Sequence, residues 1–508
     1  MSYDPSKRTL SRREALKALG IGGAATIVVD PLLANGQTEQ GSAHHVDVVV
    51  VGAGFAGMMA ARTLIRSGKK VVVLEARDRV GGRVKAGKIA GRTVDVGGMW
   101  VGPTQTKLLA LIKEYGFHLI PQFTAGKQIS VVDGKRFISE GEDSGFTVDV
   151  QKELDAIITE LDRLSAEVPL EAPWTAPRAD EFDSMTVEDW FRANVKNETA
   201  LKVLQFMARN LYQAESSQMS FLFFLFYIRS GDKVETLWGL KDAAQAFLVE
   251  EGFHGVAEKL ASELAGSIIY DAPVRRISQT ASGMVVHTER NEWTADYSVV
   301  AVPLPLSVRI AFDPPLASSR DALAQRMPMG SVIKWYLAYE EPFWREKGWN
   351  GLTTDYSSDG IECLDVTPIA GKPGLLVGFL DAKAGLQWTT RTVDERKKFV
   401  IERMTNMYGP EAARPIDYED QNWPAEEWSR GCFEAWMGPG VMTSVGRSIR
   451  EPHGRIHWAG TETSSKWMGY VEGAIRSGER AASEVLANYK QKQATPAQTA
   501  LGAGRRDL

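Results

Sequence analysis

The sequence contains only two cysteines, Cys363 and Cys432, in 508 residues. That number excludes a disulfide framework, although a single bridge between the two remains open. The chain also lacks an excess of one charge, since 59 Lys and Arg oppose 64 Asp and Glu, a formal net charge of −5. With no basic stripe and no acidic block, nothing indicates nucleic-acid binding.

Long hydrophobic runs are absent too. The apolar run at 18–29 is too short to span a bilayer, and residues 489–508 are polar, so we expect no membrane anchor and a disordered C-terminal tail. What the chain does have is an apolar fraction of 44%, with 14 Trp and 19 Phe. Its length predicts two domains or interleaved ones, and its aromatic content favours an enclosed aromatic or apolar ligand.

The remaining sequence is organised around residues 46–75, VDVVVVGAGFAGMMAARTLIRSGKKVVVLE. This pattern predicts a β-strand, a glycine-rich turn, an α-helix and a second β-strand that ends at an acidic residue, Glu75. Gly52 permits the tight turn, Gly54 lets a pyrophosphate approach the backbone, and Gly57 lets the helix pack on the strand. Glu75 is placed to accept hydrogen bonds from an adenosine ribose. We therefore predict dinucleotide binding; the alternative is an ordinary βαβ unit whose glycines only turn the chain.

Residues 1–45 read as a leader rather than as part of the fold. The run SRREALK at 11–17 resembles a twin-arginine export signal and is followed by the short apolar run. This predicts a periplasmic or exported enzyme, and the alternative is a disordered amphipathic leader.

Three further runs carry a family resemblance: LEARDRVGGR at 74–83, DVGGMWVGPTQ at 95–105 and AGTETSSKWMGYVEGAIRSGERAASEVL at 459–486. Together they resemble the flavin-containing monoamine oxidase family. The resemblance implies an α/β fold in which a Rossmann-like FAD-binding domain is interleaved with a substrate domain of mixed sheet and helices. The expected division is a leader at 1–45, FAD-binding parts at 46–120, 251–320 and 425–488, substrate parts at 121–250 and 321–424, and a polar tail at 489–508.

The resemblance also implies which residues hold FAD. Cys432 stands where some members link covalently to the flavin, and the alternative is a free buried thiol. From their chemistry alone, Arg77 and Arg83 can neutralise phosphates. The cofactor-binding candidates are Gly52, Gly54, Ala56, Gly57, Glu75, Arg77, Gly82, Arg83, Gly98, Met99, Trp100, Val274, Cys432, Glu462 and Val471. No metal site is expected.

Four residues are the catalytic candidates that the resemblance implies: Lys334, Trp423, Phe433 and Tyr470. Phe433 and Tyr470 would flank the substrate amine, and Lys334, on a predicted strand at 331–339, would help oxygen react. The alternatives are a solvated edge-strand lysine and ordinary core aromatics. A strongly aromatic run at 220–228 is predicted mainly as helical core, with some rings lining the substrate cavity.

We therefore predict a FAD-dependent amine oxidase. A deprotonated amine would lose hydride to the flavin, the imine would hydrolyse to an aldehyde or ketone, and O2 would become H2O2. The run Gly97-Gly98-Met99-Trp100 lacks the arginine with which, by the same resemblance, amino-acid oxidases bind a carboxylate, so we expect an amine without a carboxylate. The aromatic content favours an aryl-alkyl amine, and a polyamine substrate remains open. The alternatives are a periplasmic dehydrogenase that reduces a cytochrome, a flavin-dependent C–C desaturase or isomerase, and a non-catalytic flavoprotein. A homodimer remains open.

Overall fold

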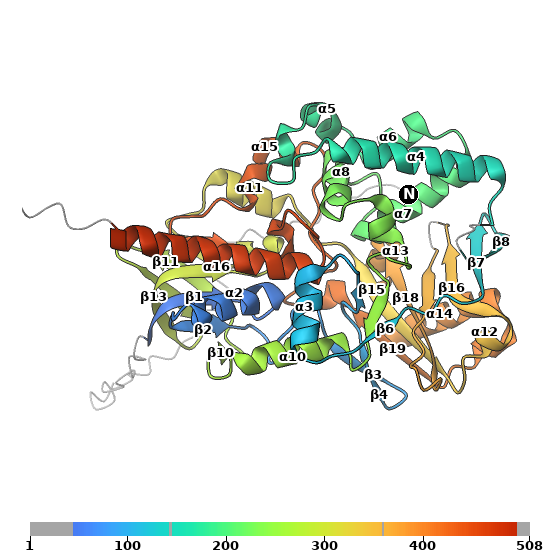
Figure 1. Cartoon of the computed structure of the whole chain (residues 1–508), viewed down its shortest axis with the longest axis horizontal. Coiled ribbons are helices and arrows are strands. Elements are labelled where there is room, and N and C mark those ends of the chain that lie inside the picture. The colour runs from blue at the N-terminus through green and yellow to red at the C-terminus, as the bar shows by residue number, and fades with distance from the viewer. Residues whose placement is uncertain (1–43, 142–144, 358–359, 495–508) are drawn as a thin grey trace, which may run out of the picture. The chain divides into compact units, whose positions relative to one another are not determined.

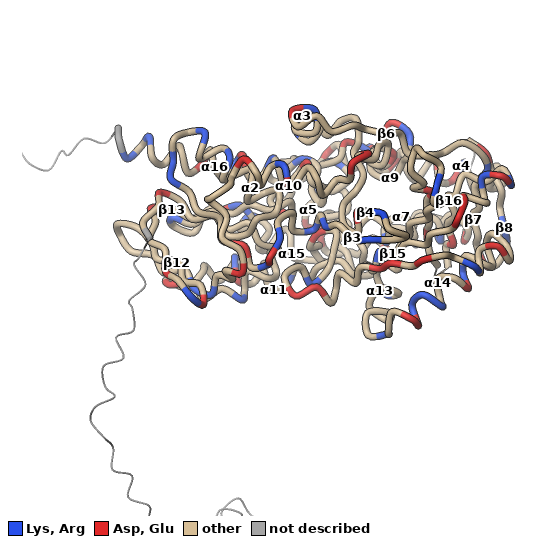
Figure 2. Tube along the Cα trace, turned by 90° about the horizontal axis from the view of Figure 1, so that it is seen from below, with Lys and Arg blue, Asp and Glu red and all other residues tan. Residues whose placement is uncertain are grey.

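The computed structural model describes residues 44–141, 145–357 and 360–494, which lie within one compact unit (Figure 1). The predicted export signal and the last fourteen residues lie outside the described part of the chain. Along the described chain, Lys and Arg alternate with Asp and Glu without separating onto one part of it, as Figure 2 shows. This distribution agrees with the absence of a basic stripe in the sequence.

The first sheet is built around the strand that opens the described chain. Its strands run in the order β10-β2-β1-β13-β12-β11-β14, with β20 also pairing with β13. The pairs β1–β2, β2–β10, β1–β13 and β13–β20 are parallel, and α2 makes the crossover between β1 and β2. The bounds are β1 (His44–Val51), β2 (Val71–Leu74), β10 (Ile268–Ile269), β11 (Val274–Gln279), β12 (Met284–Thr288), β13 (Glu292–Val300), β14 (Ala311–Asp313) and β20 (Ile456–Trp458).

Two helices from opposite ends of the described chain pack side by side on this sheet (Figure 1): α2 (Phe55–Arg66) and α16 (Val471–Ala494). Their approach is close because Gly478 has no side chain; an added Cβ would lie 2.2 Å from the Ala56 carbonyl oxygen. The helix α16 continues through Ala494, so six residues predicted as disordered tail are helical. Tyr489 holds this extension, since its hydroxyl donates to the Asp47 carbonyl at 3.1 Å.

The second sheet runs in the order β19-β15-β18-β17-β16-β7-β8. Every residue of β15 is buried, and the strand pairs with β18 on one side and β19 on the other. Lys334 is therefore not on an edge strand, and that alternative is wrong. The bounds are β7 (Lys127–Val132), β8 (Lys135–Glu140), β15 (Val332–Tyr339), β16 (Trp349–Asp355), β17 (Glu362–Asp365), β18 (Gly374–Asp381) and β19 (Asp417–Asn422).

A helical layer adjoins this sheet. Its centre is α8 (Phe221–Ser230), which begins where the Ser220 hydroxyl accepts from the Phe223 N–H. Nearly all of its side chains are buried, so the aromatic run is mostly core, as predicted. The other helices of the described chain, in this layer and elsewhere, include α3 (Thr106–Glu114), α4 (Val148–Ala166), α5 (Ala179–Ser184), α6 (Val187–Asn194), α7 (Glu198–Tyr212), α9 (Val234–Trp238), α10 (Phe253–Glu263), α11 (Ser318–Gln325), α13 (Ala382–Trp388), α14 (Val393–Tyr408) and α15 (Val441–Val445).

Candidate active site

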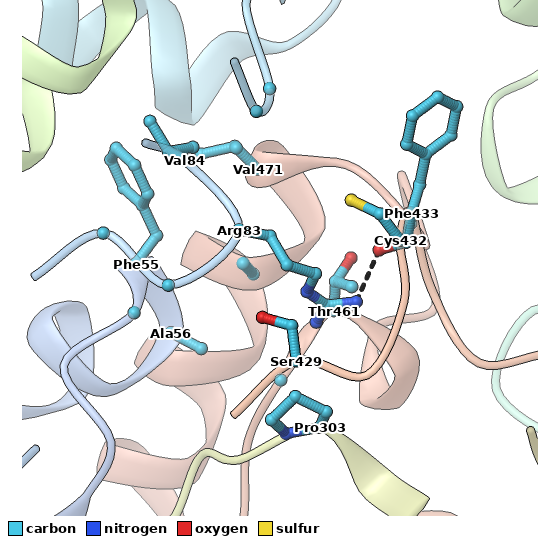
Figure 3. Close-up of a pocket in the computed structure, with 18 of the residues that line it drawn as sticks. Phe55, Ala56, Arg83, Val84, Pro303, Ser429, Cys432, Phe433, Thr461 and Val471 are labelled. Carbon is cyan, nitrogen blue, oxygen red and sulfur yellow. Dashed lines mark hydrogen bonds between the residues drawn. The ribbon is translucent and has the colours of Figure 1, made fainter. Parts of the chain in front are cut away.

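A cavity of about 260 Å³ connects the glycine turn after β1 with the helical layer (Figure 3). Most of the residues predicted from sequence contribute to its wall. The cavity is lined by Gly52, Gly54, Ala56, Glu75, Arg77, Gly82, Arg83, Gly98, Met99, Trp100, Val274, Cys432, Phe433, Tyr470 and Val471. Four candidates, Gly57, Lys334, Trp423 and Glu462, are not part of this lining and lie behind it.

The glycine turn between β1 and α2 is the first wall of the cavity. Gly52 has a φ of +99°, a conformation that favours glycine. A Cβ on Gly57 would lie 1.9 Å from the Gly52 carbonyl oxygen, so Gly57 permits the helix to pack against the turn. Gly54 differs, because the nearest atom to its added Cβ is Gly82 Cα at 3.9 Å. The cavity at Gly54 is thus open to backbone contact with a ligand.

Glu75 ends β2 beside this turn. It is buried, and its carboxylate accepts from the Ala53 N–H at 2.6 Å and from the Arg77 N–H at 3.0 Å. The carboxylate therefore joins the first strand to the second at the position where a ribose would lie. Val274, another of the cofactor-binding candidates, lines the same cavity.

The two arginines are already paired with protein carboxylates. Arg77 donates to Glu426 at 3.1 Å, and Arg83 donates to Glu462 at 2.7 Å. Arg83 also reaches across the site to the Phe433 carbonyl (Figure 3). Both arginines nevertheless line the cavity, so their role toward phosphates stays a prediction. The N-terminus of α2 adds free N–H groups and a positive dipole end to the same wall.

Lys334 lies under the segment that carries the second glycine pair. Lys334 is 2% exposed, and its ammonium donates to the carbonyls of Asp95, at 2.7 Å, and Gly97, at 2.8 Å. Burial lowers the pKa of Lys334 to about 7, and the nearby Asp95 opposes that shift. Lys334 thus supports the 95–99 backbone from below, and neighbouring Trp100 lines the cavity above it.

Trp423 supports the same segment, since its indole N–H donates to the Val96 carbonyl at 3.1 Å. Cys432 faces the cavity as a free, buried thiol. Burial raises its pKa to about 12, so the neutral thiol is the stable form without a ligand. Cys363 is also free and lies on β17, so the bridge that the cysteine count left open is not formed.

The far end of the cavity is aromatic. Tyr470, at the start of α16, lies 6.3 Å from Tyr227 between ring centroids, and Phe433 lies 6.1 Å from Phe379. All four rings line the cavity, together with Trp238 and Leu240. Phe433 and Tyr470 therefore belong to one aromatic enclosure that could hold a small apolar ligand.

Sequence reasoning missed two acids at this end. Glu362 on β17 lines the cavity and accepts from the Asn210 amide at 3.0 Å. Burial, with Asp381 nearby, raises the pKa of Glu362 to about 7. The second is Glu434, next to Phe433 and fully buried. No local pattern marks either acid, since β17 reads Glu-Cys-Leu-Asp and alternates neither in polarity nor in burial.

These residues fit a flavin dinucleotide by their chemistry. The glycine turn leaves space that side chains would otherwise fill, and Glu75 provides a hydrogen-bond acceptor for a ribose. Val471 places the N-terminus of α16 at the cavity wall. When bound, a flavin would accept the hydride from the substrate. Among the described residues, no group of His, Cys, Asp and Glu could hold a metal ion, and no helix is long and apolar enough to cross a membrane.

Comparison with known proteins agrees with this chemistry. Amine oxidase (flavin-containing) B of Canis lupus familiaris is 36% identical over 448 residues, which cover 87% of this chain and 86% of that protein. The structure of putrescine oxidase bound to putrescine matches with a TM-score of 0.84 and 30% identity, over 87% of this chain and 99% of that one. Cyclohexylamine oxidase from Brevibacterium oxydans IH-35A matches with a TM-score of 0.84 and 30% identity, over 88% and 99%.

These matches confirm the predicted α/β fold with its FAD-binding and substrate domains. The family model described as flavin containing amine oxidoreductase matches residues 55–486, most of the chain. The protein therefore belongs to the flavin-containing amine oxidoreductases, and it is a FAD-dependent amine oxidase.

Proposed function

We propose that the protein oxidises an aryl-alkyl amine without a carboxylate to an imine, with O2 as the acceptor. One observation carries the proposal: a single cavity leads from the glycine turn to an enclosure of aromatic rings. Phe433 and Tyr470 line it at the far end, and Trp100 occupies the position where related amino-acid oxidases carry an arginine. An aromatic enclosure excludes water and favours a neutral amine with an apolar body.

The far wall adds a preference within this class. Glu362, beside Phe379 across two paired strands, and Asn210 add hydrogen-bonding groups to the cavity lining, so we expect the preferred substrate to carry a hydrogen-bond donor, such as a phenol hydroxyl or a second amine, at that end. Putrescine oxidase, a relative by structure, is recorded with a diamine bound. The aromatic lining favours the phenolic amine over the short diamine.

The test is anaerobic flavin reduction by four compounds: 2-phenylethylamine, tyramine, butane-1,4-diamine and L-phenylalanine. We expect tyramine to react fastest and L-phenylalanine to react on the order of 100-fold more slowly than 2-phenylethylamine, because nothing at Trp100 binds a carboxylate. Faster reduction by L-phenylalanine would overturn the proposed substrate class. Reduction by the diamine alone would replace the aryl-alkyl proposal with a diamine oxidase.

We further propose that the leader exports the folded enzyme through the twin-arginine route. The run Ser11-Arg12-Arg13 and the apolar residues behind it support this. Replacing both arginines by Lys should retain the protein in the cytoplasm of a bacterial host, and unchanged fractionation would overturn the proposal. The acceptor is tested by comparing reoxidation in air with reoxidation by a cytochrome; a faster reaction with the cytochrome would make the enzyme a dehydrogenase.

A further inference from the structure

Met99 is the only methionine among the described residues that line the cavity. It follows the second glycine pair and is buried, with an exposed fraction of 6%. Met59 on α2 is buried to a similar degree but does not line the cavity. Met185, just before α6, is half-buried and also lies outside the lining. Met99 therefore differs from other methionines by its place in the cavity wall rather than by its exposure.

The thioether sulfur of Met99 contacts the ammonium group of Lys334. Lys334 Nζ donates to Met99 Sδ at 2.8 Å. The other two N–H groups of the ammonium have acceptors in the Asp95 and Gly97 carbonyls. An ammonium group has three donors, and a thioether is only a weak acceptor. The donor that faces the sulfur is therefore the one that a stronger acceptor at this position would bind.

A second donor lies beside the same sulfur. The hydroxyl oxygen of Tyr336 is 3.6 Å from Met99 Sδ, and the hydroxyl donates to the Asp95 carbonyl at 2.6 Å. Lys334 and Tyr336 are two residues apart on β15, so their side chains point to the same face of the sheet. The sulfur of Met99 thus contacts two proton-bearing groups at the cavity wall.

The proposed reaction supplies an oxidant at this place. Lys334 is the residue predicted to help O2 react, and reduction of O2 by the amine yields H2O2. A thioether reacts with H2O2 to give a sulfoxide. The sulfur lone pair attacks one peroxide oxygen, so the S–O bond forms, the O–O bond breaks, and sulfur loses the two electrons that the peroxide gains. The leaving hydroxide takes a proton from Lys334, which regains one from the sulfur-bound hydroxyl, and water is the second product.

We propose that Met99 is a modification site, at which H2O2 formed in the cavity converts the thioether to a sulfoxide and so inactivates the enzyme over successive turnovers. The sulfoxide adds a polar oxygen atom where Lys334 packs against the 95–99 backbone, so the segment that leads to Trp100 must shift. The inference rests on the proposed function, because it requires O2 as the acceptor. It is independent of which amine is oxidised.

Peptide mass spectrometry of the holoenzyme tests the site. One sample is turned over in air with 2-phenylethylamine and with catalase, which destroys peroxide that has left the protein. A second sample receives H2O2 without an amine. We expect the ratio of Met99 to Met185 oxidation to be about 10-fold higher during turnover, because peroxide made in the cavity meets Met99 first. Met59 should stay unmodified in both samples. An equal ratio in the two samples would overturn the inference.

The loss of activity is tested separately. Fragmentation of the peptide should place the added oxygen on Met99 rather than on Trp100, and methionine sulfoxide reductase should remove it and restore the rate. Met99→Leu has a similar volume but no sulfur, so it should keep its own starting rate through the same number of turnovers. Met59→Leu is the matched control and should lose rate as the wild type does. A decline in Met99→Leu equal to that of the wild type would contradict inactivation through Met99.

Failure of the proposed function gives a different result. If 2-phenylethylamine does not reduce the flavin, reduction by light followed by air replaces the amine and gives the same mass readout. A holoenzyme that makes no H2O2 in air would overturn the proposed acceptor. The sample with added H2O2 then decides the inference: oxidation of Met99 with Met59 intact supports the site, and the same extent of oxidation at both residues would overturn it.

Discussion

The two ends of the cavity are built differently. The glycine-turn end consists largely of glycine-rich backbone, with close contacts such as that of Gly57 against the Gly52 carbonyl, and the segments 51–56 and 74–84 supply much of its wall. The aromatic end is made of side chains from β17, α8, α9 and the loop at 428–433, brought together only by folding. A backbone site tolerates almost no change, whereas a side-chain site can change its ligand preference by single substitutions.

The contrast between the two ends of the cavity would be wrong if the glycine-turn end tolerated an added methyl group. Gly57→Ala places Cβ 1.9 Å from the Gly52 carbonyl oxygen, so we expect a loss of stability of about 3 kcal/mol and little folded protein. Gly54→Ala has room in the ligand-free protein, with its nearest neighbour at 3.9 Å, and should fold but bind FAD poorly. Thermal unfolding and flavin content check the pair. Equal stability of the two variants would contradict the assignment of Gly57 to packing and Gly54 to the cofactor.

Lys334 contacts the 95–99 backbone, which lies between the two ends of the cavity. Its pKa predicts how the stability of this region changes with pH. Its folded-state pKa of about 7 is below its ordinary value, so between pH 7 and 10 the unfolded state binds the extra proton. Wild-type stability should therefore rise with pH in that window, by a few kcal/mol relative to Lys334→Met. Chemical unfolding of the flavin-free protein at several pH values checks this. Lys88→Met, at an exposed position, should show no such trend.

At the aromatic end, Glu362→Gln should change preference more than stability. The carboxylate is the better acceptor for a donor on the substrate, so kcat/KM for tyramine should fall about 10-fold while that for 2-phenylethylamine changes little. Steady-state kinetics with both amines check the ratio, with Glu289→Gln as the control. A parallel fall for both substrates would show that Glu362 does not contact the substrate's far end.

Replacement of Cys432, which lines the cavity between its two ends, should have the smallest effect on the rate of flavin reduction. We predict that its thiol is joined to the flavin, so acid-precipitated wild type should leave a yellow pellet and Cys432→Ala a colourless one. Flavin reduction in Cys432→Ala should stay within about threefold of the wild type, because the ring is still enclosed. A colourless wild-type pellet would show that Cys432 is a free thiol in the holoenzyme.

The same contrast explains what could be predicted from the sequence. The run at 46–75 is local, and its strand, helix and glycine positions all appear in the structure, as does the strand predicted at 331–339, which spans Val332–Tyr339. The family resemblance, rather than any local pattern, implied that Phe433 and Tyr470 flank one ligand, and both rings line the cavity. The sequence alone could not show that Arg77 and Arg83 are paired with Glu426 and Glu462, because those partners lie hundreds of residues away. Glu362 and Glu434 were missed for the same reason.

The contact between Ala56 and Gly478 has a consequence for how the protein is made. The helix that covers the first βαβ unit is the last element of the described chain. A nascent polypeptide on the ribosome has the glycine turn translated early but lacks this cover until residues 471–494 have been made. We therefore expect stable capture of the cofactor only after that helix has packed, and chains truncated before residue 471 should be colourless although they contain the whole glycine turn.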